Sequence, residues 1–212
     1  MSAAPAPPPA AERVFSTGLS VAVRYASLLC GAAVERGLLG PRESDRVWPR
    51  HLLGSAVLGE LVPRDAAVVD LGSGAGLPGI PLAIARPDLA VTLVEPMLRR
   101  VRFLEQVTAT LDLPVRVLRA RAQDLPRGGS QIVVVRAVAP LSELVELVLP
   151  LLQPGGELLA VKGDRAEEEL AAAADALRSW PNVRVFLDSC GEGEHTVRVA
   201  RIALPGNDQG VR

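Results

Sequence analysis

The sequence predicts an α/β fold, built on a seven-stranded, mostly parallel, doubly wound sheet with a helical extension ahead of it. In the stretch Val68–Pro81 (VVDLGSGAGLPGIP), an apolar run leads into three glycines within five residues and then a second apolar segment. This order is typical of a buried parallel strand, a glycine-rich turn and a helix. Apolar runs then alternate with helical patterns, which indicates repeated strand–helix units. A last pair of runs joined through glycines indicates a terminal hairpin.

Length and composition suit one globular domain with a substantial core, since 49% of the 212 residues are hydrophobic and 22% are charged. The N-terminus lacks a basic region followed by an apolar one, and the longest apolar candidate, 132–152, is interrupted by charges and a proline. We therefore expect a cytoplasmic monomer with neither secretion signal nor membrane span. Two isolated cysteines predict neither a disulfide nor a metal site.

Four segments are expected along the chain. Residues 1–11 form a Pro/Ala-rich tail that we expect to be disordered, 12–63 form the helical extension, 64–204 form the main domain, and 205–212 form a second tail. The net charge of −1 offers no overall attraction for nucleic acid, so any such contact must come from local clusters of arginine. Lys162 is the only lysine beside 22 arginines, which indicates GC-rich codon usage.

Within the extension we expect a helix from Glu12 to about Leu39, with Gly31 and Gly37 as its weak points where it can break, then a loop over 41–50 and a short helix over 51–62. The loop interleaves arginines with Trp48, which fits either phosphate contact with base stacking or a solvated loop with Trp48 packed inward. In the main domain, strands are predicted at 68–71, 91–94, 115–118, 131–135, 157–161, 183–187 and 195–203, and helices at 80–85, 97–111, 141–152 and 165–180.

The glycine-rich turn predicts a site for a polar ligand, because glycine lets backbone N–H groups come close. Gly74, Gly76 and Gly79 fit the dinucleotide pattern G-x-G-x-x-G, whereas Asp70 and Gly72 start the alternative D-x-G-x-G-x-G. A carboxylate beside the turn repels a pyrophosphate and attracts a ligand that carries an ammonium and a sulfonium. The turn therefore favours S-adenosyl-L-methionine over NAD, with Asp70, Gly72 and Gly74 as cofactor contacts.

Glu95 directly follows the second predicted strand, 21 positions after Gly74. An acid at this place can accept both ribose hydroxyls of an adenosine, so it supports either cofactor. The alternative is a solvated carboxylate at a strand end.

These motifs resemble the glucose-inhibited division protein B family. The central match is DLGSGAGLPGIPLAIARPDLAVTLVEPMLRRVRFL, residues 70–104, and the likeness extends over roughly residues 20–203. Shorter matches are Arg50-His51 with Ser55, Arg121-Ala122-Gln123, Arg136-Ala137 and Val161-Lys162-Gly163.

The resemblance implies a class I S-adenosylmethionine-dependent methyltransferase that acts on N7 of a guanine in small-subunit (16S) ribosomal RNA. Its partner would be ribosomal RNA or a precursor of the small subunit. The resemblance also implies cofactor contacts at Leu77 and, on the adenine side, at Ala122 and Gln123.

Arg136 closes an apolar strand, where a charge is costly unless it has a partner. We expect it to act in catalysis, either by holding the cofactor's carboxylate or by orienting the guanine. The candidate RNA contacts are Arg50, His51, Arg99, Arg100, Arg102 and Arg121. The alternatives are a capping or structural role for His51, and a solvated helix face for the arginines at 99–102.

Other methylation chemistries lack their motifs. The segment after the fourth strand reads RAVAP rather than D/N-P-P-Y/F, and no Pro-Cys or Thr-Cys pair is present for attack on a pyrimidine carbon. Guanine N7 needs no general base, so catalysis there is mainly alignment. Two other functions stay open: a nicotinamide-dependent oxidoreductase, and a non-catalytic RNA-binding or ribosome-assembly factor on the same fold.

Overall fold

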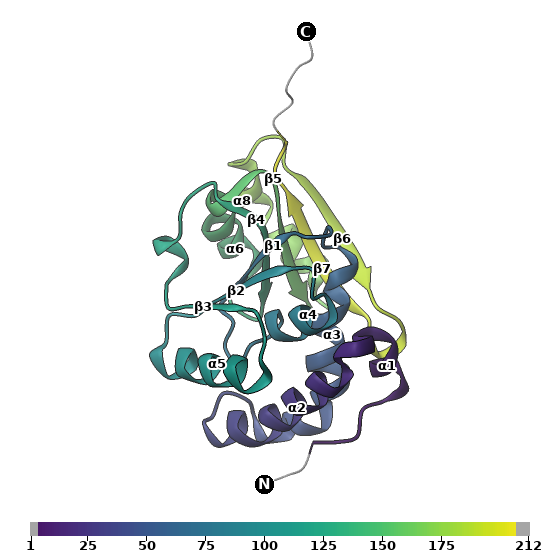
Figure 1. Cartoon of the computed structure of the whole chain (residues 1–212). Helices are drawn as coiled ribbons and strands as arrows, with labels where there is room; N and C mark the ends of the chain where they lie inside the picture. Colours follow the sequence, from purple (N-terminus) through teal and green to yellow (C-terminus); the bar gives the residue numbers. More distant parts are fainter. Residues whose placement is uncertain (1–3, 207–212) are drawn as a thin grey trace.

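A seven-stranded sheet in the order β3-β2-β1-β4-β5-β7-β6 forms the centre of the molecule (Figure 1). This computed structural model describes residues 4–206, so Met1–Ala3 and residues 207–212 of the two expected tails lie outside the described residues. Strand β7 runs antiparallel to β5 and β6, and the other pairings are parallel. The predicted mostly parallel sheet with a terminal hairpin is therefore confirmed.

The strands fall close to their predicted places. They are β1 Ala67–Leu71, β2 Ala90–Val94, β3 Arg116–Leu118, β4 Ser130–Arg136, β5 Leu152–Lys162, β6 Arg184–Cys190 and β7 Val197–Ala203. In register, Asp70 pairs with Val134 of β4, and Arg136 pairs with Val161 of β5. The C-terminal ends of β1, β4 and β5 therefore lie side by side, and the ligand sites of doubly wound sheets form at this edge.

Helices cover both faces of the sheet, as Figure 1 shows. One face is covered by α4 (Gly79–Ala85) and α5 (Leu98–Leu111) together with the N-terminal extension. The other face is covered by α6 (Leu141–Val148) and η7 (Leu149–Leu151). Neighbouring residues of a strand enter opposite cores, for example Val134 and Val135 of β4. The remaining short helices of this domain are η6 Ala122–Asp124, α7 Ala166–Ala172, α8 Ala174–Arg178 and η8 Gly193–His195.

The N-terminal extension is more broken than the single helix expected from 12 to 39. Its elements are α1 Pro9–Phe15, η1 Ser16–Gly18, α2 Leu19–Leu28, η2 Leu29–Ala33, η3 Pro41–Arg46, η4 Val47–Leu53, α3 Gly54–Ala56 and η5 Val57–Glu60. The chain turns at Ser16, whose φ is 45°, a conformation that no glycine or proline in the sequence announces. Beyond η2 the chain reaches Gly37, whose left-handed φ of 65° lies close to the predicted end of the helix at about Leu39.

Residues 4–11 are ordered against the extension, which corrects the expectation of a disordered tail up to residue 11. Helix α1 begins at Pro9, whose ring presets φ for a first helical turn, and Ala11 is fully buried. The carbonyl oxygen of Pro5 accepts a hydrogen bond of 2.8 Å from Trp48 Nε1. Apolar contact and a satisfied indole therefore fix a segment whose composition alone suggests disorder.

Trp48 is packed inward, as in the second interpretation of residues 41–50. Its indole is therefore not available to stack on a base. It is only 3% exposed, and its ring meets the edge of Phe15 at a centroid distance of 6.4 Å. The indole is therefore part of the core of the extension.

One described segment, 9–33, is long and apolar enough to cross a membrane by length and composition alone. It differs from the longest apolar candidate expected from the sequence, 132–152. Its side chains at Ala22, Tyr25, Ala26 and Leu29 are fully buried within the core that the extension shares with the sheet. A helix buried in a protein core has the same hydropathy as a membrane span, and burial in this core accounts for the hydropathy of residues 9–33.

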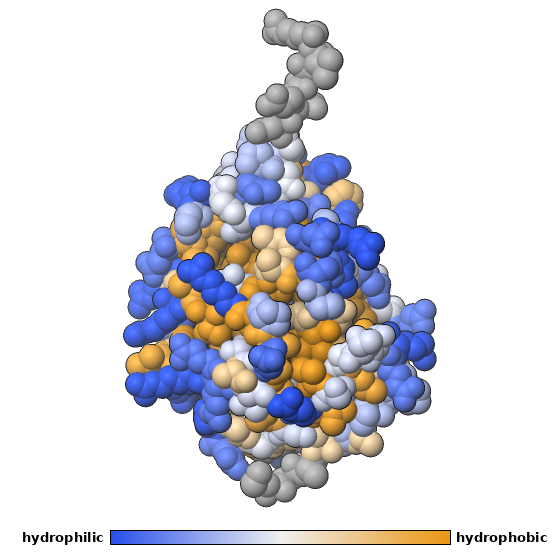
Figure 2. Space-filling model, in the orientation of Figure 1, coloured by the Kyte–Doolittle hydropathy of each residue, from blue (hydrophilic) through white to orange (hydrophobic). Residues whose placement is uncertain are grey.

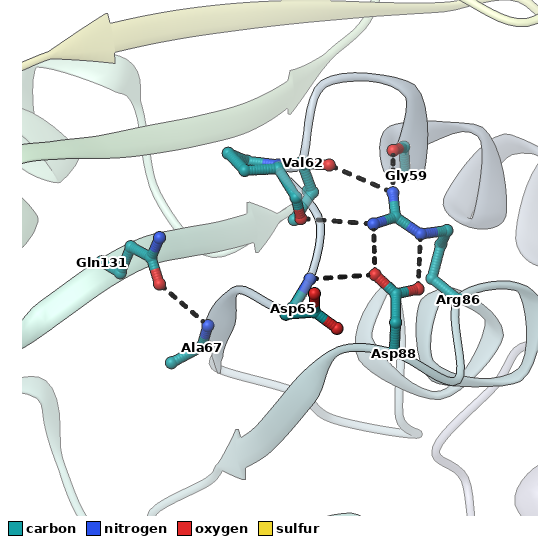
Figure 3. Close-up of polar contacts among 8 residues, drawn as sticks. Gly59, Val62, Asp65, Ala67, Arg86, Asp88 and Gln131 are labelled. Atoms are coloured by element: carbon teal, nitrogen blue, oxygen red, sulfur yellow. Dashed lines mark hydrogen bonds and ion pairs between the residues drawn. The ribbon is translucent and has the colours of Figure 1, made fainter.

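A polar clamp ties the extension to the turn between α4 and β2 (Figure 3). Arg86 forms a two-pronged ion pair with Asp88, with nitrogen–oxygen distances of 2.7 and 2.6 Å. It also donates to the carbonyl oxygens of Gly59, Val62 and Pro63 at 2.6 to 3.2 Å. All five guanidinium protons are thus used: two hold Asp88 within the turn, and three join the end of η5 and the residues after it to the sheet domain.

Figure 2 shows hydrophilic residues gathered along the outline of the face in view, with hydrophobic residues reaching the surface toward its centre. Among the described residues, the exposed large hydrophobic side chains are Met97, Leu98 and Val138. Two of these, Met97 and Val138, line a pocket at the C-terminal edge of the sheet.

Candidate functional site

Two neighbouring pockets open at the C-terminal edge of the sheet. The smaller, of about 370 Å³, lies between the ends of β1 and β2 and the loops that follow β3 and β4. The larger, of about 1080 Å³, is bounded by the extension, the segment after β4, the end of β5, α7 and the start of β7. Ala137 and Val138 line both pockets and form the wall between them.

The glycine-rich turn after β1 has the conformation that its sequence predicts. Gly72, Gly74 and Gly76 have φ angles of +74°, +60° and +99°, which favour glycine over residues with a side chain. The backbone N–H groups of Gly72 and Ser73 donate to the carbonyl oxygen of Val94 at 2.9 and 3.1 Å, which holds the turn against β2. A Cβ at position 72 would lie 2.6 Å from Val138, so the turn is closely covered there.

Asp70 braces this turn from inside and does not line either pocket. Its Oδ2 accepts hydrogen bonds from the Ser73 hydroxyl and, at 2.9 Å, from the backbone N–H of Gly79 at the start of α4. Within residues 4–206 its Oδ1 has no hydrogen-bond partner. Complete burial raises the pKa of Asp70 to about 6, against the lowering effect of those two hydrogen bonds. The structure thus assigns Asp70 to shaping the turn.

Glu95 is buried at the mouth of the smaller pocket, with 1% of its surface exposed, so it is not a solvated strand-end carboxylate. Its Oε2 accepts from the backbone N–H of Gly74 at 3.0 Å, and its Oε1 accepts from that of Met97 at 2.9 Å. Arg100 Nη1 lies 3.5 Å from Oε2. The carboxylate is therefore fixed in orientation with a lone pair to spare on Oε1.

The other side of the smaller pocket comes from η6. Ala122 and Gln123 both line it, as the resemblance implies for the adenine side. Arg121, expected at the RNA, lines this pocket too, and its backbone N–H is capped by Asp124 at 2.9 Å. Leu77 does not line either pocket but packs, partly buried, against the core beneath the turn.

Arg136 is held by the extension rather than by the glycine turn. Its Nη1 donates to the Arg50 carbonyl at 3.1 Å and to Ser55 Oγ at 3.0 Å, and its Nη2 lies 2.7 Å from His51 Nδ1. On the far side of the ring, His51 Nε2 lies 2.8 Å from Glu43 Oε2. The guanidinium thus ends a chain of polar contacts and faces the larger pocket.

The contacts with Arg136 and Glu43 fix the tautomer and the protonation state of His51. A guanidinium donates only, so Nδ1 accepts from Arg136 and Nε2–H donates to Glu43. Burial, and next the charge of Arg136, lower the pKa of His51 to about 4, which leaves the ring neutral. Burial also lowers the pKa of Arg136. His51, predicted as an RNA contact, is therefore placed as the buried support of Arg136, with 4% of its surface exposed.

The larger pocket is lined by arginines and by one ion pair whose lysine is buried and whose glutamate is partly exposed. Arg46, Arg50 and Arg165 line it from the extension and from the start of α7. Lys162 Nζ lies 2.7 Å from Glu169 Oε2. No sequence motif marks Arg165 or Glu169, although the sole lysine, within Val161-Lys162-Gly163, is a usable signal for this position.

The three predicted RNA contacts on α5 differ in exposure and in position. Arg99 and Arg102 are exposed, whereas Arg100 is half-buried, lines the smaller pocket and pairs with Glu95. Arg100 therefore belongs to the lining of the smaller pocket.

Comparisons with known proteins agree with this geometry. The family model described as "GidB: rRNA small subunit methyltransferase G" matches residues 19–197. Two relatives bear the name ribosomal RNA small subunit methyltransferase G. The protein from Mycolicibacterium gilvum is 50% identical over 191 residues, 88% of this chain and 84% of its own. That from Streptomyces avermitilis is 49% identical over 213 residues, 98% of this chain and 90% of its own.

Solved structures agree on the fold. A SAM-dependent methyltransferase from Aquifex aeolicus superposes with a TM-score of 0.56 at 15% identity, over 82% of this chain and 97% of its own. A SAM-dependent O-methyltransferase from Thermotoga maritima superposes with a TM-score of 0.56 at 14% identity, over 76% of this chain and 67% of its own. The fold is that of class I S-adenosylmethionine-dependent methyltransferases, and the family match and the relatives show that the chain belongs to the rRNA small subunit methyltransferase G family.

Proposed function

We propose that this chain transfers a methyl group from S-adenosyl-L-methionine to N7 of a guanine in small-subunit (16S) ribosomal RNA, in the cytoplasm. Membership of the family supports an enzyme that methylates small-subunit ribosomal RNA, so neither the oxidoreductase nor the non-catalytic factor is favoured. The observation that carries the choice of N7 is the wall between the two pockets.

The side chains of that wall offer no proton acceptor; the carboxylates that line the larger pocket, such as Glu169, belong to α7 and the turn before it rather than to the wall. The wall consists of Ala137 and Val138, and the strand end just before it is Arg136, whose guanidinium stays protonated. An exocyclic amine or a hydroxyl must lose a proton on methylation, whereas N7 of guanine presents a lone pair at neutral pH. Aligning N7 with the methyl group is therefore the main task of the residues at this wall.

The smaller pocket suits S-adenosyl-L-methionine. Glu95 keeps a lone pair on Oε1 for a ribose hydroxyl, since Gly74 and Arg100 occupy Oε2, and the left-handed glycines expose backbone at the turn. Ala122 and Gln123 line the side expected for adenine. When bound, S-adenosyl-L-methionine supplies a methyl group on a sulfonium, and its sulfur leaves as a neutral thioether. N7 contributes the electron pair of the new bond, and no proton is transferred.

The larger pocket suits a nucleoside turned out of its RNA strand. Its volume of about 1080 Å³ exceeds that of one base, and Arg46, Arg50 and Arg165 line it. Guanidinium groups at a pocket mouth can contact the phosphates on either side of an extruded nucleotide, which positions the RNA without reading its sequence. The partner would be ribosomal RNA or a precursor of the small subunit.

Mapping the product tests this proposal. Small-subunit RNA or particles from cells lacking the protein, incubated with purified protein and S-adenosyl-L-methionine, should gain 7-methylguanosine at one position by mass spectrometry. Glu95→Gln should bind S-adenosylhomocysteine at least tenfold more weakly by calorimetry, since one acceptor for ribose becomes a donor. Glu105→Gln, an exposed acid on α5, is the matched control. Methylation of another atom, or of no nucleotide, would overturn the proposal.

A further inference from the structure

The larger pocket contains a partly buried ion pair that the transfer of the methyl group does not require. Lys162 is the last residue of β5, one position past Val161, which pairs in register with Arg136. Its side chain is only 6% exposed, and its Nζ donates to Glu169 Oε2 at 2.7 Å and to the Ala139 carbonyl at 3.4 Å. Both members of the pair line the pocket.

Stability alone does not account for the pair. Removing an ammonium from water costs several kcal/mol, and a buried pair is often no more stabilising than apolar side chains of similar size. A second cost is the fixed geometry of two long side chains. The position of the pair at the C-terminal edge, next to Arg136, suggests a role in binding.

Donors and acceptors remain available on both side chains. An ammonium has three N–H donors, and the two contacts above leave one for a ligand. Within the described residues, Lys162 occupies Oε2 of Glu169, and this side chain lines the pocket and is 33% exposed, so Oε1 and the remaining lone pairs are available to a ligand. The pair therefore presents one donor beside a set of acceptors.

That pattern is complementary to the Watson–Crick edge of guanine. This edge carries the O6 acceptor followed by the N1–H and N2–H donors. Adenine places an N6–H donor and an N1 acceptor in the corresponding positions, so both contacts would be mismatched.

We propose that Lys162 and Glu169 recognise the target guanine, with Lys162 donating to O6 and Glu169 accepting from N1–H and N2–H. This proposal rests on the proposed function. On guanine, O6 lies between the Watson–Crick edge and N7. A base held in this way carries N7 on the side of O6 away from Glu169. Lys162 also contacts Ala139, in the same segment as the wall between the pockets, so N7 can face that wall.

Inosine at the target position tests the contact to N2. The 7-methylguanosine made by wild-type protein is first mapped, and small-subunit RNA is then joined from segments carrying guanosine or inosine there. Inosine lacks only the 2-amino group, so it should be methylated about tenfold or more slowly by the wild type, the loss expected for one hydrogen bond to a charged acceptor.

The variant Glu169→Gln should remove this preference. Its amide can turn a donor toward the 2-amino group, so guanosine methylation should fall about tenfold while inosine is methylated about as well as guanosine. The ratio of the two substrates within one variant does not depend on how much protein is folded. Glu167→Gln changes the same helix at a residue that pairs with Arg198 and lines neither pocket, and it should keep the wild-type ratio.

The outcomes are distinct. An unchanged inosine penalty in Glu169→Gln, or no penalty in the wild type, would show that the pair only tethers α7 to β5. The proposed function fails separately, if wild-type protein makes no 7-methylguanosine in the mapping step.

Discussion

At the scale of single residues, the site depends on side chains whose partners are distant in sequence. Arg136 at the end of β4 meets His51, 85 positions earlier, and His51 in turn meets Glu43. Glu43 leaves His51 one free ring lone pair, and that lone pair holds a guanidinium donor. Arg136 thus reaches the larger pocket with its orientation set by the extension, which makes Glu43 and His51 positioning residues.

The neutral state of His51 should be visible as a pH dependence of stability. Its pKa is about 4 when folded and near 6.5 when unfolded, so between these values the unfolded chain binds more protons and stability falls as the pH is lowered. The pKa of Asp70 is raised to about 6 in the folded chain, so from about pH 4 to 6 the folded chain binds the extra proton. Asp70 therefore increases stability as the pH is lowered over this range, opposite to His51. The difference between wild type and a His51 variant isolates the histidine.

We therefore expect the stability advantage of wild type over His51→Asn to shrink by about 3 kcal/mol from pH 7 to pH 4, at 1.36 kcal/mol per pKa unit. Urea unfolding at a series of pH values measures it. An advantage that is equal at both ends of this range would mean that His51 titrates alike in the folded and unfolded chains.

Sequence reasoning at this scale found the residues that follow strands and missed those that only the fold brings near. Glu95 and Gly74 share a local motif, and they are in contact. Glu43 lies in a segment predicted as a loop, and no spacing rule connects it to Arg136. Asp70 stays a predicted cofactor contact, and its motif did not show that Ser73 and Gly79 donate hydrogen bonds to its Oδ2.

At the scale of elements, buried strands were predictable and breaks in helices were not. An apolar run such as Ile132–Val135 is long enough only for a strand, and its place in the sheet follows from alternation with helices. The break at Ser16 and the separation of α7 from α8 at Ala173 arise where tertiary packing overrides helix propensity. Between residues 41 and 60, α3 and η5 pack against α4, whereas the π turn η4 packs against α1 and α2 of the extension, and neither contact has a local sequence signal.

The clamp at Arg86 should contribute measurably to folding. Lysine keeps the charge but cannot make the two-pronged pair with Asp88 while also reaching three carbonyl groups. Arg86→Lys should therefore lower the free energy of unfolding by about 2 kcal/mol, the size of a lost hydrogen bond or two to a charged group. Arg116→Lys, at an exposed position on β3, should change it by less than about 0.5 kcal/mol. Equal effects in denaturant titrations would show that the clamp is dispensable.

At the scale of the whole molecule, the extension and the sheet domain share one core. The expected boundary between residues 63 and 64 divides a single hydrophobic cluster, in which Tyr25, Leu52 and Leu58 pack with Val91 and Leu104. The extension also supplies Arg46 and Arg50 to the larger pocket and His51 to Arg136. It is therefore an integral part of both the fold and the site, which a division by sequence pattern could not show.

The molecule has almost no net charge, so binding to RNA must come from where its arginines lie. Arg50 and Arg165 line the larger pocket, and Arg99 and Arg102 are exposed on α5 near the smaller one. Each phosphate contact releases counterions, which steepens the fall of affinity with salt by about 0.7 per contact on single-stranded RNA. Removing two true contacts should therefore flatten the slope of log affinity against log salt by about 1.4.

Three double variants, each losing two positive charges, distinguish the surfaces. They are Arg50→Gln with Arg165→Gln, Arg99→Gln with Arg102→Gln, and Arg64→Gln with Arg184→Gln. The last pair is exposed at the opposite edge of the sheet, ahead of β1 and at the start of β6, and controls for overall charge. Filter binding to small-subunit RNA at several salt concentrations should give a flatter slope for the first two and the wild-type slope for the third. If all three slopes change alike, net charge rather than a defined surface governs binding, and a change in only one of the first two identifies the side on which the RNA lies.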